Sequence, residues 1–167
     1  EDFVPAEMRG AAYIDRAIPL GNGRSLAPPA VNGLMLQEAA PTPADRVLLV
    51  GDDAGYLAAL LRKLAGPIAT CPPGAFTDDG PDQPLPAGGP AAQAFDVIVI
   101  DGAIERLPEA LAAALAEGGR IVAGIVTRGV TRLAVGRKAA GVVALLPVAD
   151  LGIPVLPEFS APRRWSF

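Results

Sequence analysis

The segment near residue 50 has the pattern of a strand, a glycine turn and an amphipathic helix. This segment restricts the possible folds more than any other part of the sequence does. The apolar run from Arg46 to Val50 has the length of a strand and ends at Gly51. Four leucines, at positions 57, 60, 61 and 64, then recur at the spacing of one helical face before Gly66-Pro67. A strand that turns directly into a helix is typical of α/β proteins with a parallel sheet.

The alternation of helix and strand continues on both sides of this unit. Apolar positions at helical spacing predict a helix from Ala30 to Ala40, directly after the helix-starting pair Pro28-Pro29. Ile68 to Cys71 predicts a weak strand, and Phe95 to Ile100 has the unbroken apolar content of a central parallel strand covered on both faces. A further helix is expected from about Pro108 to Glu117.

The last part of the chain carries strands with no helices between them. Three β-branched runs are separated only by glycine turns, at 120–126, 131–135 and 142–146. We therefore expect one α/β domain over residues 1–167, with a three-layer, Rossmann-like sheet that is mostly parallel and has an antiparallel C-terminal edge. The expected buried central strands are Val47–Val50, Val97–Ile100 and Ile121–Ala123.

Residues 72–90 interrupt this regular pattern. Proline or glycine occupies ten of these nineteen positions. Proline cannot donate a backbone hydrogen bond and glycine has no side chain to pack, so this density of breakers cannot sustain a helix or a central strand. The segment is expected to be an irregular surface loop.

Composition excludes several kinds of chemistry. The chain has no histidine, one cysteine and a net charge of −4. Without histidine there is no Ser/His/Asp triad, no Cys/His pair and no His-ligated metal, and we expect no metal site. Scattered basic residues on an acidic chain argue against nucleic acid as a partner. No apolar run approaches the ~18 residues of a membrane helix, and lone Cys71 cannot close an intrachain disulfide, so a cytoplasmic protein is expected.

Ligands of an open α/β sheet bind over the carboxyl ends of its strands, which draws attention to two turns. The first turn, Gly51-Asp52-Asp53-Ala54-Gly55, lies between strand and helix but lacks the glycine spacing of a dinucleotide site. Either Asp53 caps the following helix or the turn holds a cofactor. Asp101, after the central strand, is either a turn residue or an acid over the cleft.

Several short segments add a pattern that covers nearly the whole chain. They are Phe3-Val4-Pro5, Ala12-Tyr13-Ile14-Asp15, Ile18-Pro19-Leu20-Gly21, Ser25-Leu26-Ala27-Pro28-Pro29, Arg46-Val47-Leu48-Leu49-Val50-Gly51, Gly55-Tyr56, Phe95-Asp96-Val97-Ile98-Val99, Leu107-Pro108-Glu109-Ala110-Leu111, Gly118-Gly119-Arg120-Ile121-Val122 and Leu146-Pro147-Val148. In this order they resemble the protein-L-isoaspartate O-methyltransferase family.

The resemblance implies a class I methyltransferase that binds S-adenosylmethionine and methylates the α-carboxylate of isoaspartyl residues in damaged proteins. It implies cofactor contacts from Gly51, Asp53, Gly55 and Asp101. Residues 1–29 then form the substrate side, where Ser25 and the cation of Arg24 suit a carboxylate, with a surface turn as the alternative for both. A carboxylate is already ionised at neutral pH, so the transfer needs positioning more than acid–base catalysis.

The chain departs from the family pattern at four functional positions. Asp53 replaces the second glycine of the turn, Leu49 replaces an acidic residue, Cys71-Pro72 replaces the ribose-binding acid, and Ala27 replaces a serine on the substrate side. These departures predict binding of S-adenosylmethionine weaker than the family norm. They also leave open a second function: a non-catalytic binding or scaffold domain that keeps the methyltransferase fold.

Overall fold

The computed structural model describes residues 1–21, 23–77, 80–81 and 94–161. Its centre is a six-stranded sheet in the order β10-β9-β8-β7-β3-β4. The strands are β3 (Val47–Val50), β4 (Ala69–Cys71), β7 (Phe95–Ile104), β8 (Leu115–Thr127), β9 (Val130–Ala139) and β10 (Val142–Asp150). Strands β4, β3, β7 and β8 run parallel, whereas β9 and β10 are antiparallel to their neighbours. The expected sheet with an antiparallel C-terminal edge is confirmed.

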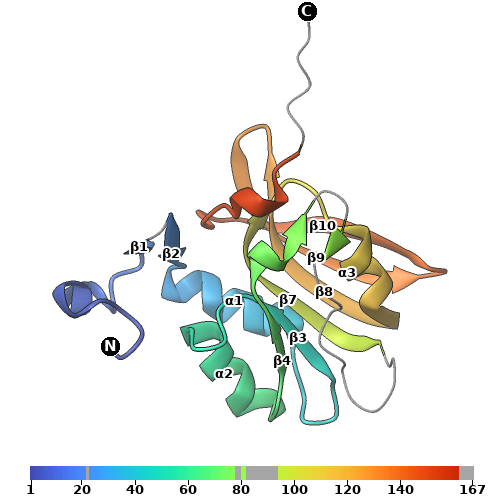
Figure 1. The fold of residues 1–167 in the computed structure, drawn as a ribbon, viewed down its shortest axis with the longest axis horizontal. Coiled ribbons are helices and arrows are strands. Elements are labelled where there is room, and N and C mark those ends of the chain that lie inside the picture. The colour runs from blue at the N-terminus through green and yellow to red at the C-terminus, as the bar shows by residue number, and fades with distance from the viewer. Residues whose placement is uncertain (22, 78–79, 82–93, 162–167) are drawn as a thin grey trace, which may run out of the picture.

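Helices cover both faces of this sheet and make three layers (Figure 1). Helices α1 (Pro29–Ala39) and α2 (Tyr56–Ala65) pack on the face that carries Leu49, and α3 (Glu109–Ala114) packs on the face that carries Leu48. Every residue of the three predicted central strand segments is at most 2% exposed. Burial on both faces explains their unbroken apolar sequence.

The predicted helix after Gly51 is confirmed as α2, but its buried face differs from the leucine pattern. Leu57 and Leu61 are buried together with Ala58 and Ala65, whereas Leu64 is 45% exposed. The two alanines face the sheet because their small side chains fit where the helix lies against it. The helix is therefore rotated relative to the stripe that the leucines alone define.

The helix expected to end at Glu117 ends at Ala114, so that prediction is wrong for its last three residues. Leu115 is extended, with φ −76° and ψ 134°, and pairs with Phe95 in the sheet. The ammonium group of Lys138 donates to the carbonyl oxygens of residues 112, 113 and 115, over distances of 2.9, 3.2 and 2.8 Å. Strand pairing and this cation end the helix early because they satisfy its free carbonyl groups.

The segment 72–90 is described only in part. Residues Pro73–Ala75 form a single 3-10 turn (η2), and Phe76–Thr77 (β5) pairs antiparallel with Gly80–Pro81 (β6). Residues 78–79 and 82–90 lie outside the described residues, so the expected irregular surface loop stays a prediction. Among the helices of the described chain, none has the length and hydropathy needed to cross a membrane.

Two terminal segments outside the six-stranded sheet complete the architecture. The first contains a 3-10 turn, Ala6–Ala11 (η1), and a hairpin of β1 (Ile18–Gly21) and β2 (Arg24–Leu26). The second segment includes Pro157–Phe159 (η3). Backbone hydrogen bonds of 2.7 and 2.8 Å join Ala103 of β7 to Pro154 and Leu156, which fixes this second segment beside the central strand.

Candidate functional site

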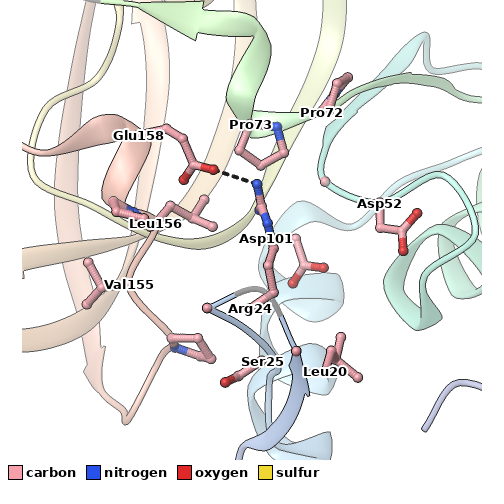
Figure 2. Close-up of a pocket in the computed structure, with 15 residues that line it drawn as sticks. Leu20, Arg24, Ser25, Asp52, Pro72, Pro73, Asp101, Val155, Leu156 and Glu158 are labelled. Atoms are coloured by element: carbon pink, nitrogen blue, oxygen red, sulfur yellow. Dashed lines mark hydrogen bonds and ion pairs between the residues drawn. The ribbon is translucent and has the colours of Figure 1, made fainter. Parts of the chain in front are cut away.

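A cavity of about 420 Å³ lies where β3 and β4 end, beside Asp101 of β7 (Figure 2). Three parts of the chain enclose it: the β1–β2 hairpin, the turns after β3 and β4, and residues 154–158. Four of its lining side chains are charged, namely Arg24, Asp52, Asp101 and Glu158. The cavity therefore lies at the carboxyl edge of the parallel strands, the usual ligand position in this type of sheet.

Gly51, directly after β3, lines the cavity and leaves it free of a side chain at this point. Its N–H donates to the carbonyl oxygen of Cys71 over 2.9 Å, which joins the ends of β3 and β4. A Cβ at this position would lie 3.0 Å from the Cβ of Asp101 and 3.3 Å from Cγ of Leu49. Only glycine fits here without displacing a neighbour.

Asp101 places a carboxylate in the lining of this cavity. Within the described chain, its side chain makes no hydrogen bond or ion pair. Burial raises the pKa of Asp101 to about 6; the nearby positive charge of Arg24 opposes this rise, and the negative charge of Asp52 adds to it. A carboxylate in these surroundings favours a cationic ligand, which would supply the missing counter-charge.

Arg24 and Ser25 also line the cavity, from strand β2. One Nη of Arg24 donates to Oε1 of Glu158 over 2.5 Å (Figure 2). The other carboxylate oxygen of Glu158, Oε2, is buried and has no hydrogen-bond partner. The structure therefore brings the two predicted substrate-side residues to the cavity and pairs Arg24 with an acid that the sequence interpretation missed.

Asp53 and Gly55 were predicted to contact a cofactor, but neither lines the cavity. The Asp53 carboxylate accepts hydrogen bonds from Oγ1 of Thr70, over 2.9 Å, and from Arg62. The Thr70 hydroxyl, followed by the Arg62 guanidinium, lowers the pKa of Asp53. Asp53 thus ties the turn to β4 and α2. It does not cap α2, which begins after Gly55 without a side-chain cap.

Asp52 takes the cavity position that was expected for Asp53. Its Oδ1 accepts the N–H of Ala54 over 3.0 Å, and its carbonyl oxygen accepts the N–H of Gly55, also over 3.0 Å. These two bonds close a compact turn that directs residues 52 and 53 to different sides. The sequence could not distinguish the two adjacent aspartates, because the direction of each depends on partners in other elements.

Of the remaining departures from the family pattern, Leu49, Ala27 and Cys71 lie in the core, whereas Pro72 is exposed and lines the cavity. Leu49 is 0% exposed and packs on the α1 and α2 side of the sheet. Ala27 is also buried, and its carbonyl oxygen accepts a hydrogen bond of 3.1 Å from the side-chain amide of Asn32. Cys71 is buried at the end of β4, and burial raises the pKa of its thiol. None of these three side chains lines the cavity.

Comparison with known proteins agrees with this geometry. Residues 1–71 match the model of the family described as protein-L-isoaspartate(D-aspartate) O-methyltransferase. A protein-L-isoaspartate O-methyltransferase from Koribacter versatilis is 36% identical over 162 residues, which cover 84% of this chain and 70% of the relative. The chain belongs to the protein-L-isoaspartate O-methyltransferase family. The hairpin with Arg24 and Ser25 and the turn at Gly51 both lie in the part that matches the family model.

Other members of the isoaspartate methyltransferase family are longer than this chain. The family member from Methylorubrum populi is 35% identical over 136 residues, which cover 73% of this chain and 64% of the relative. The corresponding figures for Methylorubrum extorquens are 34% identity and 60% of the relative. The chain thus spans about two thirds of the length of the curated relatives that it matches.

Solved structures support the same fold. A structure assigned to this family from Plasmodium falciparum, in complex with S-adenosyl-L-homocysteine, has a TM-score of 0.67 at 19% identity and covers 87% of this chain and 82% of its own. A second protein-L-isoaspartate O-methyltransferase has a TM-score of 0.72 at 15% identity and covers 96% of this chain and 59% of its own. At these identities the likeness establishes the methyltransferase fold alone.

Proposed function

We propose that this protein transfers a methyl group from S-adenosylmethionine to the α-carboxylate of isoaspartyl residues in proteins. The observation that carries the proposal is one cavity that combines two halves of such a site. Gly51 and Asp101 come from the turn and strand of the methyltransferase fold, and Arg24 and Ser25 come from the hairpin of the matched family segment. Both halves are at the carboxyl edge of the parallel strands.

Two features of the cofactor half of the cavity support binding of S-adenosylmethionine. The missing side chain at Gly51 leaves backbone accessible in the lining. Asp52 and Asp101 supply negative charge for the ammonium group and the sulfonium centre of the ligand. When bound, S-adenosylmethionine supplies an electrophilic methyl group. Of the departures named above, Asp53, Leu49, Ala27 and Cys71 lie outside the lining, whereas Pro72 is part of it.

The substrate half needs to hold an anion rather than to remove a proton. Arg24 can offer charge-assisted hydrogen bonds to a carboxylate, and the Ser25 hydroxyl, which makes no hydrogen bond within the described residues, is a second donor. An isoaspartyl carboxylate is ionised at neutral pH, so orientation of the nucleophile replaces general base catalysis. The absence of histidine is compatible with such a reaction.

The cavity is also open enough for a macromolecular substrate. The side chain of Arg24 is 40% exposed, and the apolar side chains of Leu20 and Val155 are exposed at the cavity lining. A segment of a damaged protein could lie across these residues while its carboxylate reaches Arg24. The expected partner is therefore a protein or peptide in an extended conformation.

Methyl transfer from labelled S-adenosylmethionine to matched peptides tests the proposal. A peptide with one isoaspartyl residue should acquire a base-labile label, and the same peptide with aspartate should not. Arg24→Met should reduce labelling by at least about tenfold, the effect of about 1.4 kcal/mol. Arg132→Met is the control, because Arg132 forms an exposed ion pair with Asp150 on β9 and β10. Cofactor binding without labelling of either peptide would instead support the non-catalytic binding domain.

A further inference from the structure

We propose that Glu158 is an internal competitor for the substrate carboxylate: it occupies Arg24 in the free protein, and the substrate must displace it. This inference rests on the proposed function, because it concerns the arginine that would bind the isoaspartyl group. It names a residue that limits substrate affinity rather than one that contributes to it. Three features of the Arg24–Glu158 pair carry the inference: its geometry, the burial of one Glu158 oxygen and the charge around the pair.

The Arg24 and Glu158 side chains are joined by one hydrogen bond only. A single Nη–Oε1 contact of 2.5 Å joins the two side chains, and Arg24 makes no other side-chain hydrogen bond within the described chain. Arginine–carboxylate pairs are frequently bidentate, with two parallel N–H···O bonds that fix the geometry of the guanidinium. Glu158 binds one and leaves the rest of the guanidinium available to an incoming carboxylate.

The second oxygen of Glu158 is poorly satisfied. Oε2 is enclosed by protein but accepts no hydrogen bond, although an ionised oxygen in water is fully hydrated. A buried acceptor without a partner carries an energetic penalty. If Glu158 rotates out to solvent, both of its oxygens regain hydration, which offsets part of the lost ion pair. The paired state is therefore easy to exchange.

The exchange needs only a side-chain rotation. The backbone on both sides of Glu158 is fixed, because Leu156 and Phe159 are 5% and 3% exposed and belong to the core on the α3 side of the sheet. Hydrogen bonds between Ala103 and residues 154 and 156 hold the same segment against β7. The Glu158 carboxylate can leave Arg24 while these anchors stay in place.

The negative charge around Arg24 favours displacement of Glu158 by the substrate carboxylate over simultaneous binding of both carboxylates. Three carboxylates and one guanidinium line the cavity, so its lining carries two excess negative charges when all are ionised. A second carboxylate that approached Arg24 while Glu158 remained paired would meet repulsion in a poorly solvated site. Removing the charge of Glu158 eliminates this repulsion and the competing ion pair together.

The test combines Glu158→Gln with a change in the ligand. One peptide carries an isoaspartyl residue, and its partner carries the neutral carboxamide at the same carbon. Each is titrated into the unmodified protein and into the variant by calorimetry. Glu158→Gln should tighten binding of the isoaspartyl peptide by about tenfold, equivalent to about 1.4 kcal/mol, and leave the carboxamide peptide within about twofold. Glu109→Gln, at an exposed glutamate in the first turn of α3, is the control.

Each result has a separate meaning. Weaker binding of the isoaspartyl peptide by Glu158→Gln would overturn the proposal, because it would make Glu158 a positioning residue for Arg24. Equal effects on both peptides would also overturn it, since a competitor of a carboxylate cannot act on a neutral amide. If Glu158→Gln does not fold, Glu158→Asp is titrated with the same two peptides. Its shorter side chain reaches Arg24 less well, so tighter binding of the isoaspartyl peptide alone is expected, and unchanged or weaker binding of that peptide would overturn the proposal. If the unmodified protein and the variant both fail to distinguish isoaspartyl from aspartyl peptides, the proposed function itself fails.

Discussion

Replacing Asp101 by asparagine should stabilise the folded protein at neutral pH while weakening its affinity for S-adenosylmethionine. The reason is the burial of a carboxylate that has no bonding partner in the described chain. Its pKa rises from the ordinary value of 3.8 to about 6 in the folded state. This difference corresponds to about 2 to 3 kcal/mol, where the lower figure allows for solvent that reaches the carboxylate through the cavity.

The pH dependence gives the sign of this effect. The folded protein holds the Asp101 proton more tightly than the unfolded chain does, so ionisation of Asp101 favours unfolding. Its destabilising contribution is nearly absent below the unfolded value of 3.8, grows between 3.8 and about 6, and is complete above that range. Asparagine is neutral throughout. The gain in the free energy of unfolding should therefore be about 2 to 3 kcal/mol at pH 7.5 and roughly half of that at pH 5.

Urea unfolding of both proteins at pH 7.5 and pH 5, followed by circular dichroism, measures this difference. The slope with denaturant should stay unchanged, because the variant exposes the same surface on unfolding. Calorimetric titration with S-adenosylmethionine should show a loss of roughly tenfold or more in affinity, since a charge-assisted bond to the ligand is removed. A stability gain that is equal at both pH values, or no gain at all, would refute the argument from burial.

Three further substitutions test other parts of the structure. In thermal melts, Gly51→Ala should lower the free energy of unfolding by about 1 to 3 kcal/mol, and it should impair cofactor binding, because its Cβ meets Asp101 and Leu49. Gly33→Ala, in open space on α1, is the control and should raise the free energy of unfolding by about 0.5 to 1 kcal/mol. Leu61→Ala should cost about 2 to 5 kcal/mol in urea unfolding and Leu64→Ala less than about 1, so equal costs would contradict the orientation of α2. Asp53→Gly should change S-adenosylmethionine affinity by less than about threefold and lower stability only slightly, since it removes exposed bonds outside the cavity. A large gain in affinity by calorimetry would instead support obstruction of the turn by this side chain.

The parts of the fold that sequence patterns predicted are those that local chemistry determines. Val47–Val50 and Val97–Ile100 are apolar throughout because the sheet covers both faces of these strands, so their pattern alone identifies them. The end of α3 could not be predicted, because Leu115 leaves the helix to pair with Phe95 of β7. Strand pairing in the folded protein determines where α3 ends, so helix propensity alone does not predict this boundary.

The candidate site shows the same division. Asp101 and Gly51 could be placed because each follows from the end of an apolar strand, and Arg24 and Ser25 could be placed through the family resemblance. Glu158 gave no signal, since it is a single acid in a proline-rich stretch and its partner is 134 positions away. The orientation of Asp53 depends on Thr70 and Arg62, which lie on two other elements.

The position of the cavity walls has a consequence for hydrogen exchange. All six strands of the central sheet lie between residues 47 and 150, whereas the walls come from the 18–26 hairpin and from residues 154–158. The hairpin wall can therefore open and reclose while the sheet keeps its hydrogen bonds, in a sub-global fluctuation of low free energy, whereas hydrogen bonds to Ala103 hold the 154–158 wall on β7. Amides of the hairpin should exchange with deuterium long before those of β3 and β7. A substrate that contacts both walls would slow amide exchange in the hairpin. Hydrogen exchange of the hairpin would therefore measure substrate binding directly.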